Sequence, residues 1–251
     1  MERTWEELAP GVVRCRLAGW DETVGAVAGD ESVLMIDAGP DTATSAALLR
    51  ELRALFTRPV RHLALTHLHF DHVLGAPAVL GATRYAATGA RALLTPEGRS
   101  GLVSDATAHG AEGDGARRDA AALTAPDIEV DTSLTVELGG RSVVLASAGP
   151  GHTGADLVVH VPDAAVVFCG DLVEESGEPQ AGPDAHPSRW AAALDGVLTL
   201  GGPSARYVPG HGAVVDAAFV RSQRDSLARR FGNDTPTGPG ARQCPDTDGG
   251  A

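Results

Sequence analysis

Residues 66–72 read Thr-His-Leu-His-Phe-Asp-His and place three imidazoles and one carboxylate directly after a short apolar run. His67 and His69 are two residues apart, so in an extended segment their side chains point the same way and can share one metal ion. Asp71 and His72 come after the chain turns, so they face another direction and can serve a second ion. A lone histidine is more often solvated or hydrogen-bonded, but the H-x-H-x-D-H spacing at a strand end predicts metal binding.

Three further polar residues, His152, Asp171 and His211, each follow a predicted strand inside a glycine turn. Glycine next to a ligand lets the backbone adopt positive φ and approach an ion closely. Taken singly each signal is weak, because Asp171 could equally cap a helix and His152 could be an ordinary turn histidine. The repetition of the same pattern at three strand ends favours metal ligation.

Together these candidates form a ligand set for two metal ions. The first ion would be held by His67, His69 and His152. The second would be held by Asp71, His72 and His211, with Asp171 bridging both. Imidazole and carboxylate donors without thiolate suit zinc, and iron or manganese is compatible with the same set. Two ions about 3.5–4 Å apart would share a water molecule and lower its pKa to about 7, which supplies hydroxide at neutral pH.

The composition of the chain limits its partners and its compartment. Its 251 residues suffice for a sizeable core, and one domain over residues 1–231 is favoured over two small ones. The formal net charge of −13 argues against a nucleic-acid-binding surface and against adhesion to anionic lipid. The acidic start at residues 1–7 is not a secretory signal, and no apolar run is long enough to span a membrane. We expect a cytoplasmic protein that acts on a small molecule, with its oligomeric state left open.

The predicted strands and helices suggest two sheets face to face with helices outside. Short apolar runs bounded by turn residues predict strands at 12–17, 23–28, 32–36, 60–65, 128–130, 134–138, 142–147, 157–161 and 165–168. Helical periodicity is found after residue 41 or 42 and over 188–200 and 217–231. Both halves of the chain contain strands, a helix and a strand followed by candidate ligands, which predicts a mixed α/β fold.

Two segments depart from this pattern. Residues 95–125 contain almost no large apolar residues, which predicts a mobile loop or a loosely packed helical insertion that could act as a lid. His109 lies in this segment and is expected to be solvated. Residues 232–251 are rich in Pro, Gly, Thr and Asp without periodicity, so we expect a disordered tail.

Two other positions near the candidate ligands are open to a structural interpretation. Asp37 could be a ligand, but a carboxylate beside a glycine turn more often braces neighbouring backbone, so it is left out of the predicted site. Residues 174–190 lie between two ligand positions, and Trp190 could wall a pocket while His186 or Arg189 contacts an anionic group. The favoured interpretation is that Ser188 caps a helix and Trp190 packs beneath it.

The order of the candidate ligands resembles the metallo-β-lactamase-fold superfamily, whose pattern is H-x-H-x-D-H, then histidine, a bridging aspartate and a final histidine. The match runs from about residue 23 to residue 212. The resemblance implies an α/β (α+β) fold class, a four-layer αββα sandwich with the site at the rim between the sheets. It also implies a catalytic role for Asp71, which would orient the hydroxide or pass a proton besides binding metal.

The subfamily is not assigned by this resemblance, because the chain departs from several subfamily patterns. True β-lactamases of this fold carry cysteine or serine where this chain has Asp171, and oxygen-reducing diiron members usually carry glutamate where it has His69. Lactone hydrolases carry a tyrosine shortly after the bridging aspartate, which residues 172–175 lack. Thioesterases similar to glyoxalase II carry basic residues in their C-terminal part, whereas the tail here is acidic.

The resulting hypothesis is a metal-dependent hydrolase that uses a hydroxide held between two zinc ions to cleave an ester, a thioester, a lactone or a related bond of a small molecule. Phosphodiester cleavage is compatible with the same site. One alternative is an iron-dependent oxidoreductase similar to persulfide dioxygenases, and another is an amide hydrolase similar to β-lactamases. A non-catalytic protein that keeps the fold is disfavoured because all seven candidate ligands are present.

Overall fold

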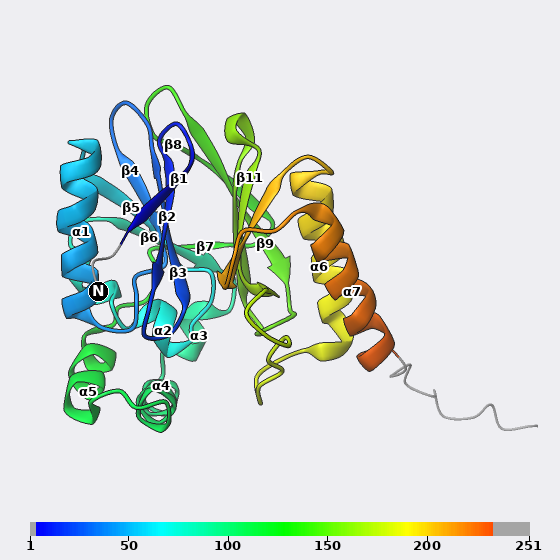
Figure 1. The fold of residues 1–251 in the computed structure, drawn as a ribbon. Helices are drawn as coiled ribbons and strands as arrows, with labels where there is room; N and C mark the ends of the chain where they lie inside the picture. Colours follow the sequence, from blue (N-terminus) through cyan, green and yellow to red (C-terminus); the bar gives the residue numbers. More distant parts are fainter. Residues whose placement is uncertain (1–3, 233–251) are drawn as a thin grey trace, which may run out of the picture.

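The computed structural model describes residues 4–232 and shows two β-sheets packed face to face, with helices on both outer faces (Figure 1). The N-terminal sheet contains β1 (Trp5–Ala9), β2 (Val12–Leu17), β3 (Glu22–Ala28), β4 (Val33–Ile36), β5 (Val60–Ala64), β6 (Thr83–Ala87) and β7 (Ile128–Val130). The C-terminal sheet contains β8 (Ser133–Glu137), β9 (Ser142–Gly149), β10 (Asp156–Val161), β11 (Val166–Glu174) and β12 (Arg206–His211). The predicted four-layer α/β arrangement is confirmed.

The two sheets are joined at one edge. Strands β1 to β4 pair antiparallel and β4 to β7 pair parallel, while β8 to β11 pair antiparallel and β12 adds parallel to β11. Glu22 of β3 lies opposite His211 of β12, so the end of β12 continues the N-terminal sheet. This junction places a candidate ligand from the second half of the chain beside strands from the first half.

The outer layers are formed by three long helices. Helix α1 (Thr42–Phe56) covers the N-terminal sheet, and α6 (Pro187–Gly201) with α7 (Ala217–Phe231) covers the C-terminal sheet (Figure 1). Leu48 and Leu52 of α1 are fully buried, as is Trp190 of α6. Because each buried large apolar side chain contributes about 1.5–3 kcal/mol, these contacts hold the layers together.

Helix α1 begins where the sequence predicts it. The Asp41 side chain accepts a hydrogen bond from the backbone N–H of Thr44 at 2.7 Å, which satisfies one of the free donors of the first turn. The helix ends at Phe56, and the C-cap residue Thr57 has a left-handed φ of 54°. The short helices α2 (Phe70–Val73) and α3 (Ala90–Leu93) follow β5 and β6, and two 3₁₀ turns lie at Ala76–Ala78 and Pro162–Ala164.

The segment predicted as a loop or a helical insertion is helical. It forms α4 (Pro96–Ala108) and α5 (Gly113–Ala122), capped by Thr95 and Glu112, whose side chains accept from the first-turn amides. Asp119 of α5 accepts hydrogen bonds from the backbone N–H of Thr42 at 3.0 Å and from its hydroxyl at 2.8 Å. This contact fastens the helical pair to the start of α1, and a lid function remains a prediction.

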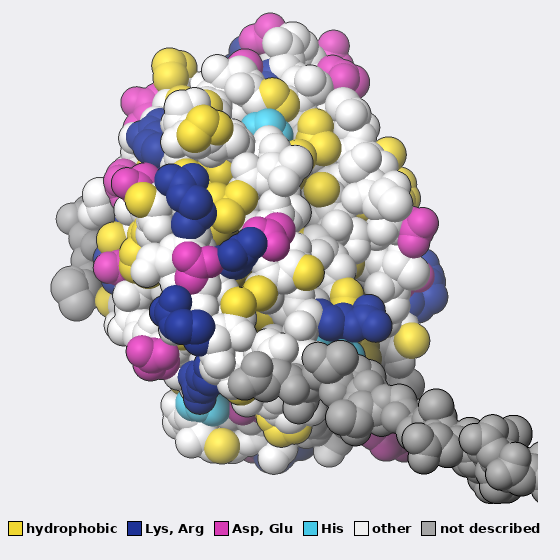
Figure 2. Space-filling view, turned by 90° about the vertical axis from the view of Figure 1, so that its right-hand side faces the viewer, with side chains coloured by type: hydrophobic (Ala, Val, Ile, Leu, Met, Phe, Trp, Pro, Cys, Tyr) yellow, Lys and Arg dark blue, Asp and Glu magenta, His cyan; other side chains and the backbone are white. Residues whose placement is uncertain are grey.

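The face formed by α6 and α7 mixes charges of both signs (Figure 2). Arg224 of α7 pairs with Asp195 of α6 at 2.8 Å, which links the two helices across their exposed surface. Within residues 4–232, no helix combines the length and the apolar character needed to cross a bilayer. The predicted tail lies outside the described residues, apart from Gly232.

Candidate metal centre

The histidine cluster lies in the segment between β5 and α2 and in the first turn of α2. The strand ends at Ala64, the chain bends at Thr66, and His69 has extended backbone before α2 begins at Phe70. The period of two in the extended part sends His67 and His69 toward the same region, as predicted. Asp71 and His72 instead belong to the first turn of α2, which directs them toward the C-terminal sheet.

The other three candidates reach the same region from the C-terminal half. His152 lies in the loop after β9, and His211 is the last residue of β12. The predicted strand end before Asp171 is wrong, because β11 continues to Glu174 and Asp171 lies within it. Asp171 directly follows Gly170, where φ is 54° and the pairing register with β12 shifts. A β-carbon at Gly170 would lie 2.7 Å from Oγ1 of Thr66, so this glycine allows β11 to approach the histidine loop closely.

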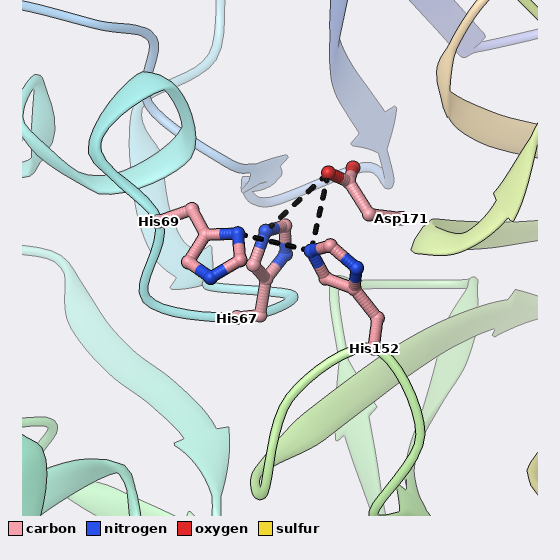
Figure 3. A group of neighbouring side chains, drawn as sticks. All are labelled: His67, His69, His152 and Asp171. Carbon is pink, nitrogen blue, oxygen red and sulfur yellow. Dashed lines mark hydrogen bonds and ion pairs between the residues drawn. The ribbon is translucent and has the colours of Figure 1, made fainter. Parts of the chain in front are cut away.

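The first group consists of three histidines and one carboxylate that face one another (Figure 3). One ligand atom from each of His67, His69, His152 and Asp171 lies within 4.8 Å of the others. Oδ2 of Asp171 lies 3.7 Å from Nε2 of His67 and 3.4 Å from Nε2 of His152. Nε2 of His152 lies 2.9 Å from Nδ1 of His69.

The second group lies on the other side of Asp171. Atoms of Asp71, His72 and His211 lie within 4.8 Å of one another. Oδ1 of Asp171 lies 3.1 Å from Nε2 of His72, and its Oδ2 lies 3.4 Å from Nε2 of His211. The structure therefore brings all seven predicted residues together, with Asp171 in contact with both groups.

The donor atoms fit a metal centre. Nε2 of His67, Nε2 of His72 and Oδ1 of Asp171 are buried and have no hydrogen-bond partner among the described residues. A buried polar atom without a partner costs about 1–3 kcal/mol, and here three such atoms converge. Imidazole nitrogens and carboxylate oxygens are ligands of divalent transition metals, so cations at this position would satisfy all three.

The electrostatic environment keeps part of the set ready to bind a cation. Burial lowers the pKa of His152 from 6.5 to about 4, and burial with the neighbouring His72 lowers that of His67 well below its usual range. Burial acts in the same direction on His211, but the adjacent Asp171 and Asp71 raise its pKa to about 11. Without metal, protonated His211 thus stands in for a cation beside the two carboxylates, while His67 and His152 are neutral and able to ligate.

The comparison with known proteins identifies the family. The model of the Metallo-beta-lactamase superfamily matches residues 19–211, which is more than half of the chain. The chain belongs to the metallo-beta-lactamase superfamily. This family is the one that the order of the seven residues predicts, and it supports a metal-dependent hydrolase in general terms.

Curated members of the superfamily show modest identity to this chain. The "Metallo-beta-lactamase type 2" of Bacillus cereus is 24% identical over 199 residues, covering 78% of this chain and 69% of that protein. The protein of the same name from Bacteroides fragilis is 36% identical over 93 residues, covering 36% of this chain and 37% of that protein.

Solved structures of the superfamily share the fold. A metallo-beta-lactamase from Pseudomonas aeruginosa in its mono-zinc form has a TM-score of 0.71 at 20% identity, covering 93% of this chain and 97% of that one. A metallo-beta-lactamase from Pontibacter korlensis has a TM-score of 0.64 at 22% identity, covering 89% and 93%. The predicted fold class is confirmed, and the substrate is not carried over at this identity.

In this member of the superfamily, Asp37 orients a candidate ligand. Its Oδ1 accepts from the backbone N–H of Thr66 at 2.7 Å and its Oδ2 from the Thr66 hydroxyl at 2.8 Å, so it braces backbone as expected. Its Oδ2 also lies 2.9 Å from Nδ1 of His72, which leaves Nε2 of that ring facing the centre. The contact with His72 was not predicted, although Asp37 and the histidine loop follow adjacent parallel strands and so reach the same sheet edge.

The other candidate histidines are oriented in the same manner. Nδ1 of His211 lies 3.0 Å from the Trp20 carbonyl oxygen, and Nδ1 of His152 lies 3.2 Å from the Gln180 carbonyl oxygen. Nε2 of His69 lies 3.1 Å from Oδ2 of Asp184. Each ring is held by one nitrogen and presents the other to the centre.

Glu174 is a site residue that the sequence analysis did not identify. One oxygen of Glu174 lies within 4.8 Å of ligand atoms of both Asp171 and His211. Burial and the nearby Asp171 raise its pKa to about 7. The signal was an acidic residue three positions after Asp171, near the end of an apolar strand.

Glu22 is a second buried carboxyl group that the sequence analysis did not identify. It lies opposite His211 in the β3–β12 pair, is fully buried, and neither side-chain oxygen has a hydrogen-bond partner among residues 4–232. Burial raises its pKa well above the usual range. A neutral carboxyl group is therefore expected beneath the second group of candidate ligands.

Trp190 lies behind the site rather than in a pocket wall. It is fully buried, its Nε1–H donates to the Leu172 carbonyl oxygen at 3.0 Å, and its ring lies 5.4 Å from that of His152. The expected packing beneath the helix is correct, but the predicted cap is wrong. His186 occupies the N-cap position without a side-chain cap hydrogen bond, because Pro187 is already the first helical residue and Ser188 follows it.

His109 is 58% exposed, in agreement with the expectation that it is solvated. Its ring also stacks on Phe70 at a centroid distance of 5.5 Å, and Trp20 packs edge-on against the same phenylalanine at 5.0 Å. Because Phe70 lies between His69 and Asp71 in sequence, the C-terminal end of α4 stands beside the candidate metal centre.

Proposed function

We propose that this protein is a hydrolase that uses two divalent ions, zinc in the first instance, to cleave an ester, thioester or lactone bond of a small molecule. The observation that supports it best is the position of Asp171, whose carboxylate contacts both groups of candidate ligands. A carboxylate between two metal positions suits a dinuclear centre, since its two oxygens can serve one ion each. Membership of the superfamily supports hydrolysis in general.

Two divalent ions bound here would supply an acidified water molecule and a Lewis acid that polarises the bond under attack. The side chains of the protein would hold the attacking water molecule in place and accept its proton. Asp71 is suited to this task because its Oδ2 lies 3.4 Å from Nε2 of His211, near the centre. Burial would raise its pKa, but His72 and His211 outweigh that effect and lower it, so Asp71 is a carboxylate at neutral pH.

Amide hydrolysis of the β-lactam type is the second candidate, because the curated relatives carry the name metallo-beta-lactamase. The carboxylate of Asp171 argues against it as the main activity, since β-lactamases of this fold carry cysteine or serine at the corresponding position. An iron-dependent oxidation is the third, because five imidazoles and two carboxylates also suit iron. We therefore favour hydrolysis of esters, thioesters or lactones.

The test combines metal analysis with a substrate panel. The protein is purified without added metal, its metal content is measured, and zinc-loaded and chelator-treated samples are compared on chromogenic esters, thioesters, lactones, phosphodiesters and a cephalosporin. We expect about two zinc ions per chain after loading and turnover of at least one ester, thioester or lactone that chelation abolishes. Turnover of the cephalosporin alone, or co-purification of iron without any hydrolysis, would contradict the proposal.

A further inference from the structure

A further group of possible ligand atoms shares His211 with the second group and includes Glu174, which is not among the seven predicted residues. Ligand atoms of Asp171, Glu174 and His211 lie within 4.8 Å of one another. In the β11–β12 register, Glu174 is the partner of His211, so the two side chains start from neighbouring positions on adjacent strands. Glu174 is only 7% exposed, so its carboxyl group is directed into the protein beside the centre.

The end of β11 holds Glu174 in a defined position. Its Oε1 accepts a hydrogen bond from the Ser176 hydroxyl at 2.8 Å, and its backbone N–H donates to Oε1 of Gln223 at 3.0 Å. Gln223 also donates through Nε2 to the Leu172 carbonyl oxygen at 2.8 Å, so α7 fixes the end of the strand at two positions. A carboxyl group held this way loses little conformational freedom on binding a cation.

Asp171, which shares a group of possible ligand atoms with Glu174, has a buried oxygen without a hydrogen bond within residues 4–232. Its Oδ1 has no hydrogen bond from any described residue, and its contact there is an ion pair with Nε2 of the fully buried His72 at 3.1 Å. The carboxyl groups of Asp171 and Glu174 both lie beside the His211 imidazole. Like charges this close repel each other, and a bound metal ion would offset this repulsion in place of the proton on His211.

We propose that Glu174 is an eighth ligand and that it makes the second metal position selective for a six-coordinate ion such as Mn²⁺. The inference rests on the proposed dinuclear hydrolase and concerns its second ion. Glu174 would add a carboxylate beside Asp171 and His211, the two residues whose ligand atoms lie within 4.8 Å of its own. Carboxylates favour harder ions such as manganese, so an added carboxylate shifts the preference of this position away from zinc. The first position keeps three imidazoles and one carboxylate, a set that suits zinc.

The experiment measures manganese binding directly and does not depend on turnover. The full-length protein is freed of metal with a chelator and given one equivalent of zinc to fill the first position. Mn²⁺ is then titrated in while the electron paramagnetic resonance signal of the free ion is followed. We expect the wild type to bind one Mn²⁺ per chain and Glu174→Gln to bind it at least about tenfold more weakly, with the affinity for the first zinc unchanged.

Glu137→Gln is the matched control, because it removes the same carboxylate from an exposed position on the edge strand β8. Its Mn²⁺ affinity should equal that of the wild type. Glu174→Asp keeps the charge but withdraws it by one methylene, so it should fold even if Glu174→Gln does not, and it should also bind Mn²⁺ more weakly. Circular dichroism establishes which variants are folded.

Wild-type Mn²⁺ affinity in folded Glu174→Gln or Glu174→Asp would overturn the assignment of Glu174 while leaving the dinuclear hydrolase intact. Equal loss of zinc and manganese would also overturn it, because it would show that Glu174 supports the fold of the whole site. A wild type that binds no second ion of any kind would instead contradict the proposed dinuclear function itself.

Discussion

The Asp171 side chain connects the two groups of candidate ligands. Its Oδ2 lies 3.4 Å from Nε2 of both His152 and His211, and its Oδ1 lies 3.1 Å from Nε2 of His72. Burial alone would raise its pKa, but His72 and His67 outweigh that effect and hold it well below the usual range. The carboxylate is therefore ionised before a metal arrives, and it presents negative charge to both positions.

Asp71→Asn should leave folding largely intact while reducing turnover by roughly 10²–10⁴-fold, because a neutral amide cannot accept a proton from the attacking water. The measurement is kcat on whichever substrate of the panel is cleaved, with thermal unfolding as the check on folding. Asp131→Asn, at an exposed turn between β7 and β8, should keep wild-type kcat. Near-native turnover by the Asp71 variant would show that another group takes the proton.

His152 should make the metal-free protein less stable in acid. Its pKa is about 4 in the folded protein, against 6.5 as the ordinary value. As the pH falls from 6.5 to 4 the unfolded chain takes up a proton at His152 and the folded protein does not. The free energy of unfolding should therefore drop by roughly 3 kcal/mol over this window from this residue alone.

Urea unfolding of the metal-free protein between pH 4 and pH 7 tests this expectation. His152→Gln removes the titrating group. Between pH 6.5 and pH 4, its free energy of unfolding should therefore fall by roughly 3 kcal/mol less than that of the wild type. The same slope in the variant and the wild type would mean that burial does not suppress protonation of His152.

At the scale of secondary structure, the site depends on strand ends that lie close together. The carboxyl ends of the parallel strands β4 and β5 bring Asp37 to Thr66 and His72, and the bulge at Gly170 brings β11 against the same loop. The first contact holds the imidazole of the candidate ligand His72 itself, and the second brings the backbone of Gly170 against Thr66. Together they decide where His72 and Asp171 point.

Asp37→Asn should weaken metal binding by about 10–100-fold, since an amide cannot accept from both Thr66 donors and from Nδ1 of His72 at once. Metal affinity is measured by competition with a chromophoric chelator, and Asp131→Asn again serves as the comparison. If Asp37→Asn bound metal as tightly as the wild type, the orientation of His72 would not depend on this hydrogen bond.

Gly170→Ala should destabilise the protein in two ways, through left-handed backbone strain and through a clash with Thr66. Gly149→Ala is the control, because it introduces the strain alone. Gly170 has φ of 54° and its β-carbon would meet Thr66 at 2.7 Å, whereas Gly149 has φ of 75° with nothing within 4 Å. Left-handed strain should cost each alanine variant about 1–3 kcal/mol. Only Gly170→Ala should lose further stability in urea unfolding and also lose metal affinity. Equal losses in the two variants would show that the close approach to Thr66 is unimportant.

At the scale of the whole molecule, the site lies where the two sheets join and where the α4–α5 pair stands beside it. The pair is fastened to α1 by Asp119 and reaches the site through the stacking of His109 on Phe70. A segment with few large apolar residues depends on such polar contacts for its position.

Asp119→Ala should therefore loosen α4 and α5 without releasing metal. Because the two hydrogen bonds to Thr42 are lost, the free energy of local opening of this segment should fall by about 1–3 kcal/mol. The measurement is amide hydrogen exchange over residues 96–122, which should become faster. Metal stoichiometry should stay that of the wild type, since the residue contacts no candidate ligand. Unchanged exchange in α4 and α5 would mean that apolar contacts alone hold the pair.

Local sequence was sufficient to predict the seven candidate ligands and the layer arrangement. The spacing of His67 and His69, the cap at Asp41 and the glycines beside His152 and His211 are features of consecutive residues, and local backbone geometry follows from them. Strand β1 was missed because Trp5–Ala9 contains two glutamates at an edge, where no apolar alternation is required.

Tertiary structure alone decided which groups surround those ligands. The contact of Asp37 with His72, the carbonyl of Trp20 behind His211 and the approach of Glu174 to Asp171 join residues through strand pairing and sheet packing. Such contacts depend on which strands lie side by side and in what register, and spacing along one chain does not encode either. The sequence therefore determined the candidate donors, and the packing of two sheets determined how they are oriented.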